Sequence, residues 1–110
     1  MITYQLVNSN LFKLKPLDQE IICEEIEEIV LASGLDPSKR MTLRTKKGSY
    51  HWHLKKQKEK GVLEITYWPS KERLLLEIHQ NRRANWNEEM IETLSALFED
   101  AFGGVVIKNV

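Results

Sequence analysis

The segment His51-Trp52-His53 carries the residues of this chain best suited to chemistry. Side chains two residues apart on a β-strand point to the same side, so both imidazoles face one way, as the ligands of some zinc sites do. His79 is predicted to face the same side and is the obvious third ligand. The strand order described below, however, separates His79 from His53 by two strands and roughly 16 Å, whereas zinc–nitrogen bonds are only about 2 Å long. We therefore expect no metal site and no cofactor.

Glu64 and Glu77 are a second candidate site, because two adjacent carboxylates can share a proton and serve in acid–base catalysis. Lys55 and Arg40 fall in the same predicted row of the sheet and would neutralise both carboxylates. We therefore interpret this row as a structural charge ladder. If the protein is instead an enzyme, the plausible catalytic centre consists of these two carboxylates together with His51 and His53.

Motifs for nucleophilic or phosphate chemistry are missing from the sequence. No serine lies in a Gly-x-Ser-x-Gly motif, and no glycine-rich phosphate-binding loop is present. The single cysteine, Cys23, lies on the apolar side of a predicted helix, which favours a buried thiol, and it cannot form an internal disulfide by itself. We therefore predict a protein without catalytic residues.

The elements that must position these residues follow from the spacing of apolar side chains. The chain of 110 residues is long enough for one domain, and two segments have helical spacing, 16–33 and 86–102. Between them the period changes to two, in four short runs separated by turn residues: 40–45, 50–57, 62–68 and 73–80. This order predicts a single two-layer α+β domain, in which a four-stranded antiparallel meander has one helix before it and one after it. Each strand has one apolar side, so we expect both helices on one sheet face.

The ends of the chain also alternate apolar and polar residues. The alternating segments are 2–6 and 12–14, and the apolar run 105–107 is a further possible strand. We expect them to form extra strands at the edges of the sheet or to pair with a second copy of the chain.

The turns between the predicted strands set the register. Counting inward from the turns at 46–49, 58–61 and 69–72 gives the residues that face one another on the uncovered sheet face. These turns pair Arg44 with His51, His51 with Trp68, Trp68 with Arg73, His53 with Thr66, Thr66 with Leu75, Lys55 with Glu64, and Glu64 with Glu77. The pair of Lys55 and Glu64 supports this register, whereas the opposed carboxylates of Glu64 and Glu77 count against it.

The formal net charge is zero, but the charges are segregated along the chain. Residues 39–60 contain nine basic residues and one acidic residue, whereas both predicted helices are acidic. Lysine and arginine neutralise phosphates, and a nearby aromatic ring can stack on a base. The alternative function is therefore nucleic acid or polyanion binding by Arg40, Arg44, Lys46, Lys47, Lys55, Lys56 and Arg73.

Apolar residues on the otherwise polar uncovered face favour protein association instead. Trp68 and Leu75 lie there among charged residues, and aromatic residues with arginine are enriched at the centres of interfaces. We therefore predict a non-catalytic protein that associates with another protein or with a second copy of itself. The predicted contact residues are Arg44, His51, Trp68, Arg73 and Leu75.

We expect no membrane association. No apolar run approaches the ~18 residues of a membrane-spanning helix. Residues 1–6 contain no basic region followed by an apolar one, so no secretory signal is expected there. The default expectation is a location in the cytoplasm.

Overall fold

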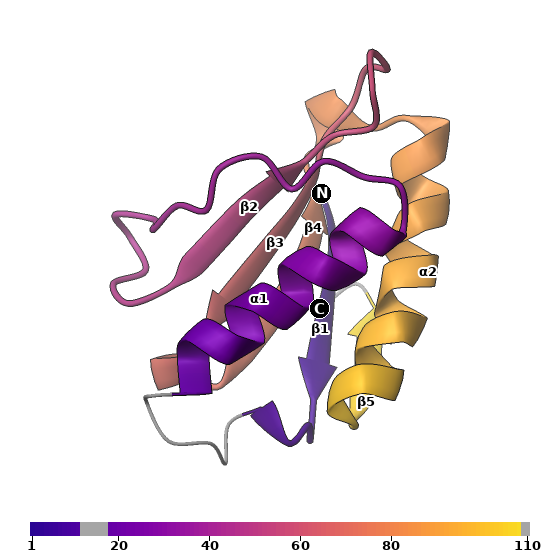
Figure 1. The fold of residues 1–110 in the computed structure, drawn as a ribbon. Coiled ribbons are helices and arrows are strands. Elements are labelled where there is room, and N and C mark those ends of the chain that lie inside the picture. The colour runs from indigo at the N-terminus through magenta and orange to yellow at the C-terminus, as the bar shows by residue number, and fades with distance from the viewer. Residues whose placement is uncertain (12–17, 109–110) are drawn as a thin grey trace.

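A computed structural model of the chain describes residues 1–11 and 18–108. Over these residues, five strands form one antiparallel sheet in the order β2-β3-β4-β1-β5 (Figure 1). Two helices, α1 (Gln19–Ala32) and α2 (Asn85–Phe102), complete an α+β architecture. The strands are β1 (Ile2–Val7), β2 (Tyr50–Leu54), β3 (Leu63–Trp68), β4 (Arg73–Ile78) and β5 (Val105–Lys108).

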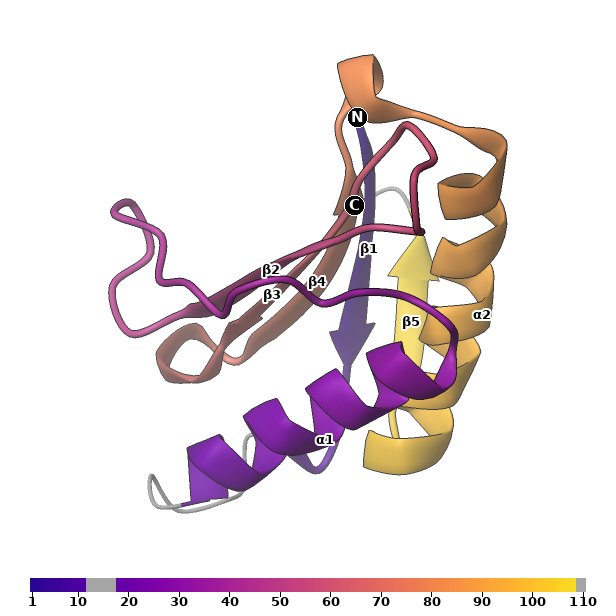
Figure 2. The same cartoon turned by 45° about the horizontal axis from the view of Figure 1, so that its top comes forward.

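Both helices lie against the same face of the sheet, as the apolar alternation predicts (Figure 1 and Figure 2). Trp52 donates its indole N–H to Glu27 of α1 over 2.9 Å, and Tyr4 donates its hydroxyl to Glu92 of α2 over 2.7 Å. Trp52 and Tyr4 belong to one row of side chains that crosses four strands. The core therefore lies between one sheet face and the two helices, and it leaves the other face without a helix.

The two helices form where the helical spacing predicts them. Helix α1 buries one stripe of its surface, and Gly34 follows it at a φ of 80°. Helix α2 begins where Asn87 accepts the N–H of Ala84 over 3.0 Å and donates to the carbonyl of Val62 over 3.1 Å, which ties the start of the helix to the residue before β3. The predicted residues 16 and 17 lie outside the described part of the chain. Among the described helices, none has the length and apolar character needed to cross a membrane.

The predicted strand at 40–45 is wrong, and the predicted four-stranded meander is therefore wrong in its first strand. This segment forms an isolated bridge between Met41 and His51, and Met41 is 37% exposed. The terminal segments supply the missing strands, because β1 pairs with β4 and β5 pairs with β1. Tyr4 and Leu6 of β1 are buried, so this strand gives the sheet apolar area that 40–45 does not. Residues 2–6 and 105–107 do form strands, but only β5 lies at an edge of the sheet, because β1 pairs on both sides; 12–14 lies outside the described residues.

The predicted register holds between β3 and β4 but not between β2 and β3. Trp68 pairs with Arg73, as predicted. In the other hairpin, Glu64 faces His53 instead of Lys55, which is a shift of two residues. β2 ends at Leu54, and the backbone of Lys55 pairs with Asp36 on the other edge of this strand. A shift of two keeps each side chain on its predicted face but changes its neighbours.

Candidate metal centre

The sheet face that carries no helix, here called the open face, presents every second side chain of each strand. Its neighbours are set by the register, because residues opposite one another on adjacent strands form rows. One row consists of His51, Thr66, Leu75, Gln5 and Ile107. The next row consists of His53, Glu64, Glu77 and Thr3. Chemistry-bearing side chains from β2 and β3 therefore meet at one end of these two rows.

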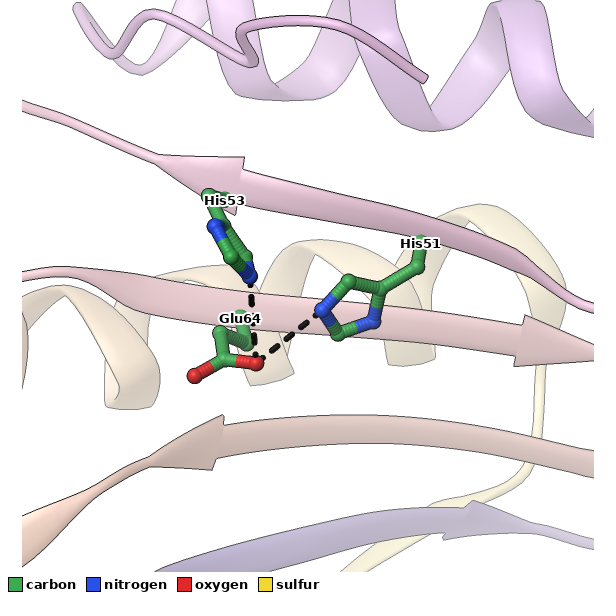
Figure 3. Close-up of side chains that lie close together, drawn as sticks. All are labelled: His51, His53 and Glu64. Atoms are coloured by element: carbon green, nitrogen blue, oxygen red, sulfur yellow. Dashed lines mark hydrogen bonds and ion pairs between the residues drawn. The ribbon is translucent and has the colours of Figure 1, made fainter. Parts of the chain in front are cut away.

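The three histidines of the chain gather around one carboxylate on this face. His51 Nε2 lies 3.0 Å from Glu64 Oε1, and His53 Nε2 lies 3.4 Å from the same oxygen (Figure 3). His79, which directly follows β4, places Nε2 2.8 Å from Glu64 Oε2. We call these four residues the histidine–glutamate cluster.

The predicted separation of roughly 16 Å between His79 and His53 is wrong, because both rings contact the same carboxylate. The two-residue shift of β2 on β3 is the reason. It moves His53 from opposite Thr66 to opposite Glu64, and Glu64 in turn pairs with Glu77 on the strand that His79 follows. The predicted distance is therefore too long, but His79 does not join His51 and His53 as a ligand within the described residues, because the group of donors within 4.8 Å does not include it.

The four side chains of the cluster differ in how deeply they are buried. The side chain of His51 is 2% exposed and that of Glu64 is 12% exposed. The side chains of His53 and His79 are 37% and 45% exposed. The cluster therefore has a buried floor and a rim that solvent reaches.

Thr66 fixes the orientation of the buried imidazole. Its Oγ1 lies 2.7 Å from His51 Nδ1, and Thr66 itself is fully buried. With Glu64 ionised, the ring donates from Nε2 to the carboxylate, and the Thr66 hydroxyl donates to Nδ1. Both ring nitrogens of His51 are therefore engaged, and Nε2 is directed at Glu64.

The environment favours an ionised Glu64 beside a neutral His53. Burial alone would raise the pKa of Glu64, but the hydrogen bond from His51 and the electrostatic interactions with the three histidines hold this pKa below its ordinary value. Burial lowers the pKa of His53 and outweighs the attraction of the Glu64 carboxylate, and the electrostatic effects of His51 and Arg82 act in the same direction as burial. A neutral imidazole keeps a lone pair that can coordinate a metal ion.

Three of the four residues have the geometry of a ligand set. In the described part of the chain, His51, His53 and Glu64 each offer a ligand atom within 4.8 Å of the other two. Tetrahedral zinc with bonds of about 2.0–2.1 Å holds its ligand atoms about 3.3 Å apart. The separations of 3.0 and 3.4 Å at Glu64 Oε1 are close to this value. Two imidazoles and a carboxylate suit zinc and neighbouring transition metals.

The predicted charge ladder around Glu64 is wrong. The register places His53, and not Lys55, opposite Glu64. Arg40 lies on the helical side of the sheet, where its guanidinium reaches Glu20 at 2.7 Å and Glu27 at 2.8 Å. The hydrogen bond from Arg40, together with that from Trp52, holds the pKa of Glu27 below its ordinary value although burial opposes this. The partners of Glu64 are therefore histidines.

The predicted association residues do not all form one exposed surface. Trp68 and Arg73 pair on the open face, and Arg44 is exposed in the preceding loop. His51 and Leu75 lie on the open face but are only 2% and 7% exposed, so they offer little contact area. The loop that precedes β2 contacts Trp68, whose indole N–H donates to the carbonyl of Lys47 in this loop over 2.9 Å.

Arg40 does not belong to the predicted polyanion-binding surface. Arg40 is held by two glutamates of α1, and it lies on the side of the sheet opposite Arg73. Lys56 lies 3.7 Å from Glu59, in a weaker ion pair. The remaining predicted residues are the exposed Arg44, Lys47, Lys55 and Arg73 and the half-buried Lys46. Nucleic acid binding stays a prediction.

The sequence interpretation missed Glu64 and His79 as partners of the two β2 histidines. The alternation of side chains along each strand had placed the two β2 histidines, Glu64 and His79 on one sheet face, and this face is correct. The usable signal was the opposed pair of Glu64 and Glu77, because two facing carboxylates call for positive groups nearby. Sliding β2 by two residues would have brought histidines to Glu64 without moving any apolar residue out of the core.

Comparison with known proteins adds no assignment to this geometry. No protein-family model matches the chain, and no curated protein and no solved structure matches it either.

Proposed function

We propose that this protein binds one divalent transition metal ion of the zinc type through His51, His53 and Glu64. The observation that carries the proposal is the placement of three donor atoms from two adjacent strands within 4.8 Å of one another. The strands are paired in the sheet, so the donors are held by backbone hydrogen bonds and not by a loop. A ligand set on rigid elements binds a metal with little loss of conformational entropy.

Thr66 supports this proposal from behind the ligands. A metal-bound histidine usually donates its second ring N–H to a fixed acceptor, which holds the ring in place. For His51 to coordinate through Nε2, its proton must move to Nδ1, and the Thr66 hydroxyl then accepts a hydrogen bond from Nδ1–H over 2.7 Å. Thr66 can therefore donate a hydrogen bond to the metal-free ring of His51 and accept one from the metal-bound ring.

Zinc titration of the protein, purified without a histidine tag and treated with a chelator, tests the proposal by calorimetry. We expect one ion per chain and stabilisation against thermal unfolding by about 2.7 kcal/mol at a free zinc concentration of 100 times Kd. His53→Ala removes a ligand whose side chain is 37% exposed, so the fold should persist. Its zinc affinity should fall by more than the ~10–100-fold typical of residues outside the coordination shell.

Lys55→Ala is the matched control for His53→Ala. Lys55 is exposed and lies two residues further along the chain, but it is not among the three ligands. Its zinc affinity should equal that of the wild type. A wild-type protein that takes up no zinc, or a His53→Ala variant that binds zinc as tightly as the wild type, would refute the proposed centre.

We propose self-association through the open face as a second function. The supporting observation is that Val105 and Ile107 of β5 are 57% and 45% exposed on this face. Arg73, Leu75 and Glu77 follow one another at alternate positions of β4, on the same face. If two open faces stack with a two-fold axis between them, over Leu75, Arg73 of each copy lies against Glu77 of the other, so the face is complementary to itself in charge. The same stacking covers the row of His53 and Glu64, so this dimer and a metal centre open to solvent exclude each other.

Sedimentation velocity at micromolar concentration tests this second function. We expect a dimer for the wild type and a shift toward monomer for Arg73→Glu, because each Glu77 then faces a like charge. The double exchange of Arg73→Glu with Glu77→Arg restores opposite charges and should restore the dimer. A monomeric wild type, or a double variant no more dimeric than Arg73→Glu, would rule out this arrangement.

A further inference from the structure

We infer that a metal ion in this centre keeps one exchangeable coordination position, which faces solvent and takes a small anionic ligand, and that His79 is a positioning residue for Glu64 and not a fourth ligand. This inference rests on the proposed metal site. It deepens that proposal by assigning a binding activity to the metal.

The two oxygens of Glu64 have different partners. Oε1 faces His51 and His53 at 3.0 and 3.4 Å, whereas Oε2 lies 2.8 Å from His79 Nε2. A carboxylate that binds a metal through both oxygens would have to give up the contact with His79. A hydrogen bond to the non-coordinating oxygen instead holds the carboxylate in one orientation. The arrangement therefore favours coordination through Oε1 alone.

The coordination shell is incomplete on the solvent side. Within the described residues, the grouping of histidine, cysteine and acidic side chains supplies three donors, and His79 is not one of them. His51 and Thr66 form the buried floor, whereas His53 and His79 are exposed at the rim. Zinc sites with three protein ligands complete their tetrahedron with water or a substrate atom. The fourth position is therefore expected to be open to exchange.

The charge at this position selects the ligand class. A divalent ion bound by two neutral imidazoles and one carboxylate retains a net charge of about +1. A small anion, such as a carboxylate or hydroxide, is favoured there over a neutral donor.

Cobalt(II) serves as a coloured substitute for zinc in the test. We expect one cobalt ion per wild-type chain, with a visible absorption spectrum that changes saturably when sodium azide is added, at one azide per cobalt. His79→Ala should still bind cobalt, with affinity lowered by about 10–100-fold, and its spectrum should still respond to azide. Gln80→Ala, an exposed change at the next residue, should behave as the wild type.

The outcomes separate this inference from the metal site itself. A wild-type cobalt spectrum that azide leaves unchanged would show that the shell is already closed. Loss of cobalt affinity well beyond 100-fold in His79→Ala would make His79 a ligand. Either result overturns the inference while the proposed centre stands; failure of the wild type to bind cobalt overturns both. If His79→Ala does not fold, His79→Gln and the wild-type azide titration decide the question.

Discussion

Replacement of Trp52 by alanine is expected to lower the free energy of unfolding by about 3–5 kcal/mol, the range for large aromatic residues in a core. Trp52 is fully buried between the sheet and α1, and its indole N–H donates to Glu27 over 2.9 Å. The substitution removes the apolar contacts, leaves a cavity and deprives Glu27 of a donor. Urea unfolding followed by circular dichroism measures the loss.

Trp68→Ala is the matched control, because it removes the same side chain from the open face. Trp68 is only half-buried, and its indole N–H reaches the carbonyl of Lys47 in an exposed contact. We expect this variant to lose about 1 kcal/mol, close to the value of one hydrogen bond. Equal losses for the two tryptophans would contradict the assignment of the core to the helical side.

The same Trp52→Ala variant should also weaken zinc binding while it remains folded. Trp52 lies between His51 and His53, and it is the side chain of that segment that packs into the core. Without it, β2 is held less firmly against α1, and the two imidazoles lose part of their fixed orientation. Zinc affinity measured well below the unfolding midpoint tests this link between core packing and the site. Wild-type affinity in folded Trp52→Ala would mean that pairing with β3 alone positions the histidines.

Gly104→Ala is expected to cost about 2–5 kcal/mol of unfolding free energy, from left-handed backbone strain and overpacking together. Gly104 has a φ of 81°, and an added Cβ would collide with the carbonyl oxygen of Val7 and lie 2.9 Å from the backbone nitrogen of Ser9. These neighbours are backbone atoms at the end of β1, so no side-chain rotation relieves the contact. The loss should appear in urea unfolding, because β5 begins at the next residue and pairs with β1.

Gly48→Ala separates strain from collision. Gly48 has nearly the same φ, 77°, but an added Cβ there would meet no atom within 4 Å. Its cost should be about 1–2 kcal/mol, from the left-handed conformation alone. If both glycine variants lose the same free energy, the close approach of Gly104 to β1 contributes nothing.

The sequence by itself determined both helices, most of the strands and the faces that they present, but it wrongly added a strand at 40–45. Helical spacing located α1 and α2 to within a few residues, and strict alternation located β2, β3 and β4. Because side chains alternate along a strand, alternation also placed His51, Glu64 and His79 on the face away from the helices. These features depend on residues near one another in the chain, so a local pattern is enough to predict them.

Only the tertiary structure decided which strands are neighbours and which residues meet across them. The alternation of 40–45 resembles that of 2–6, yet the sheet takes up β1, where Tyr4 and Leu6 become buried. A two-residue slide of β2 along β3 leaves the same side chains in the core, so hydrophobic patterning does not distinguish the two registers. The contacts of Lys55 with Asp36 and of Arg40 with α1 join segments distant in the chain. The histidine–glutamate cluster depends on this register, because a strand's sequence specifies the side to which a residue points but not its partner on the next strand.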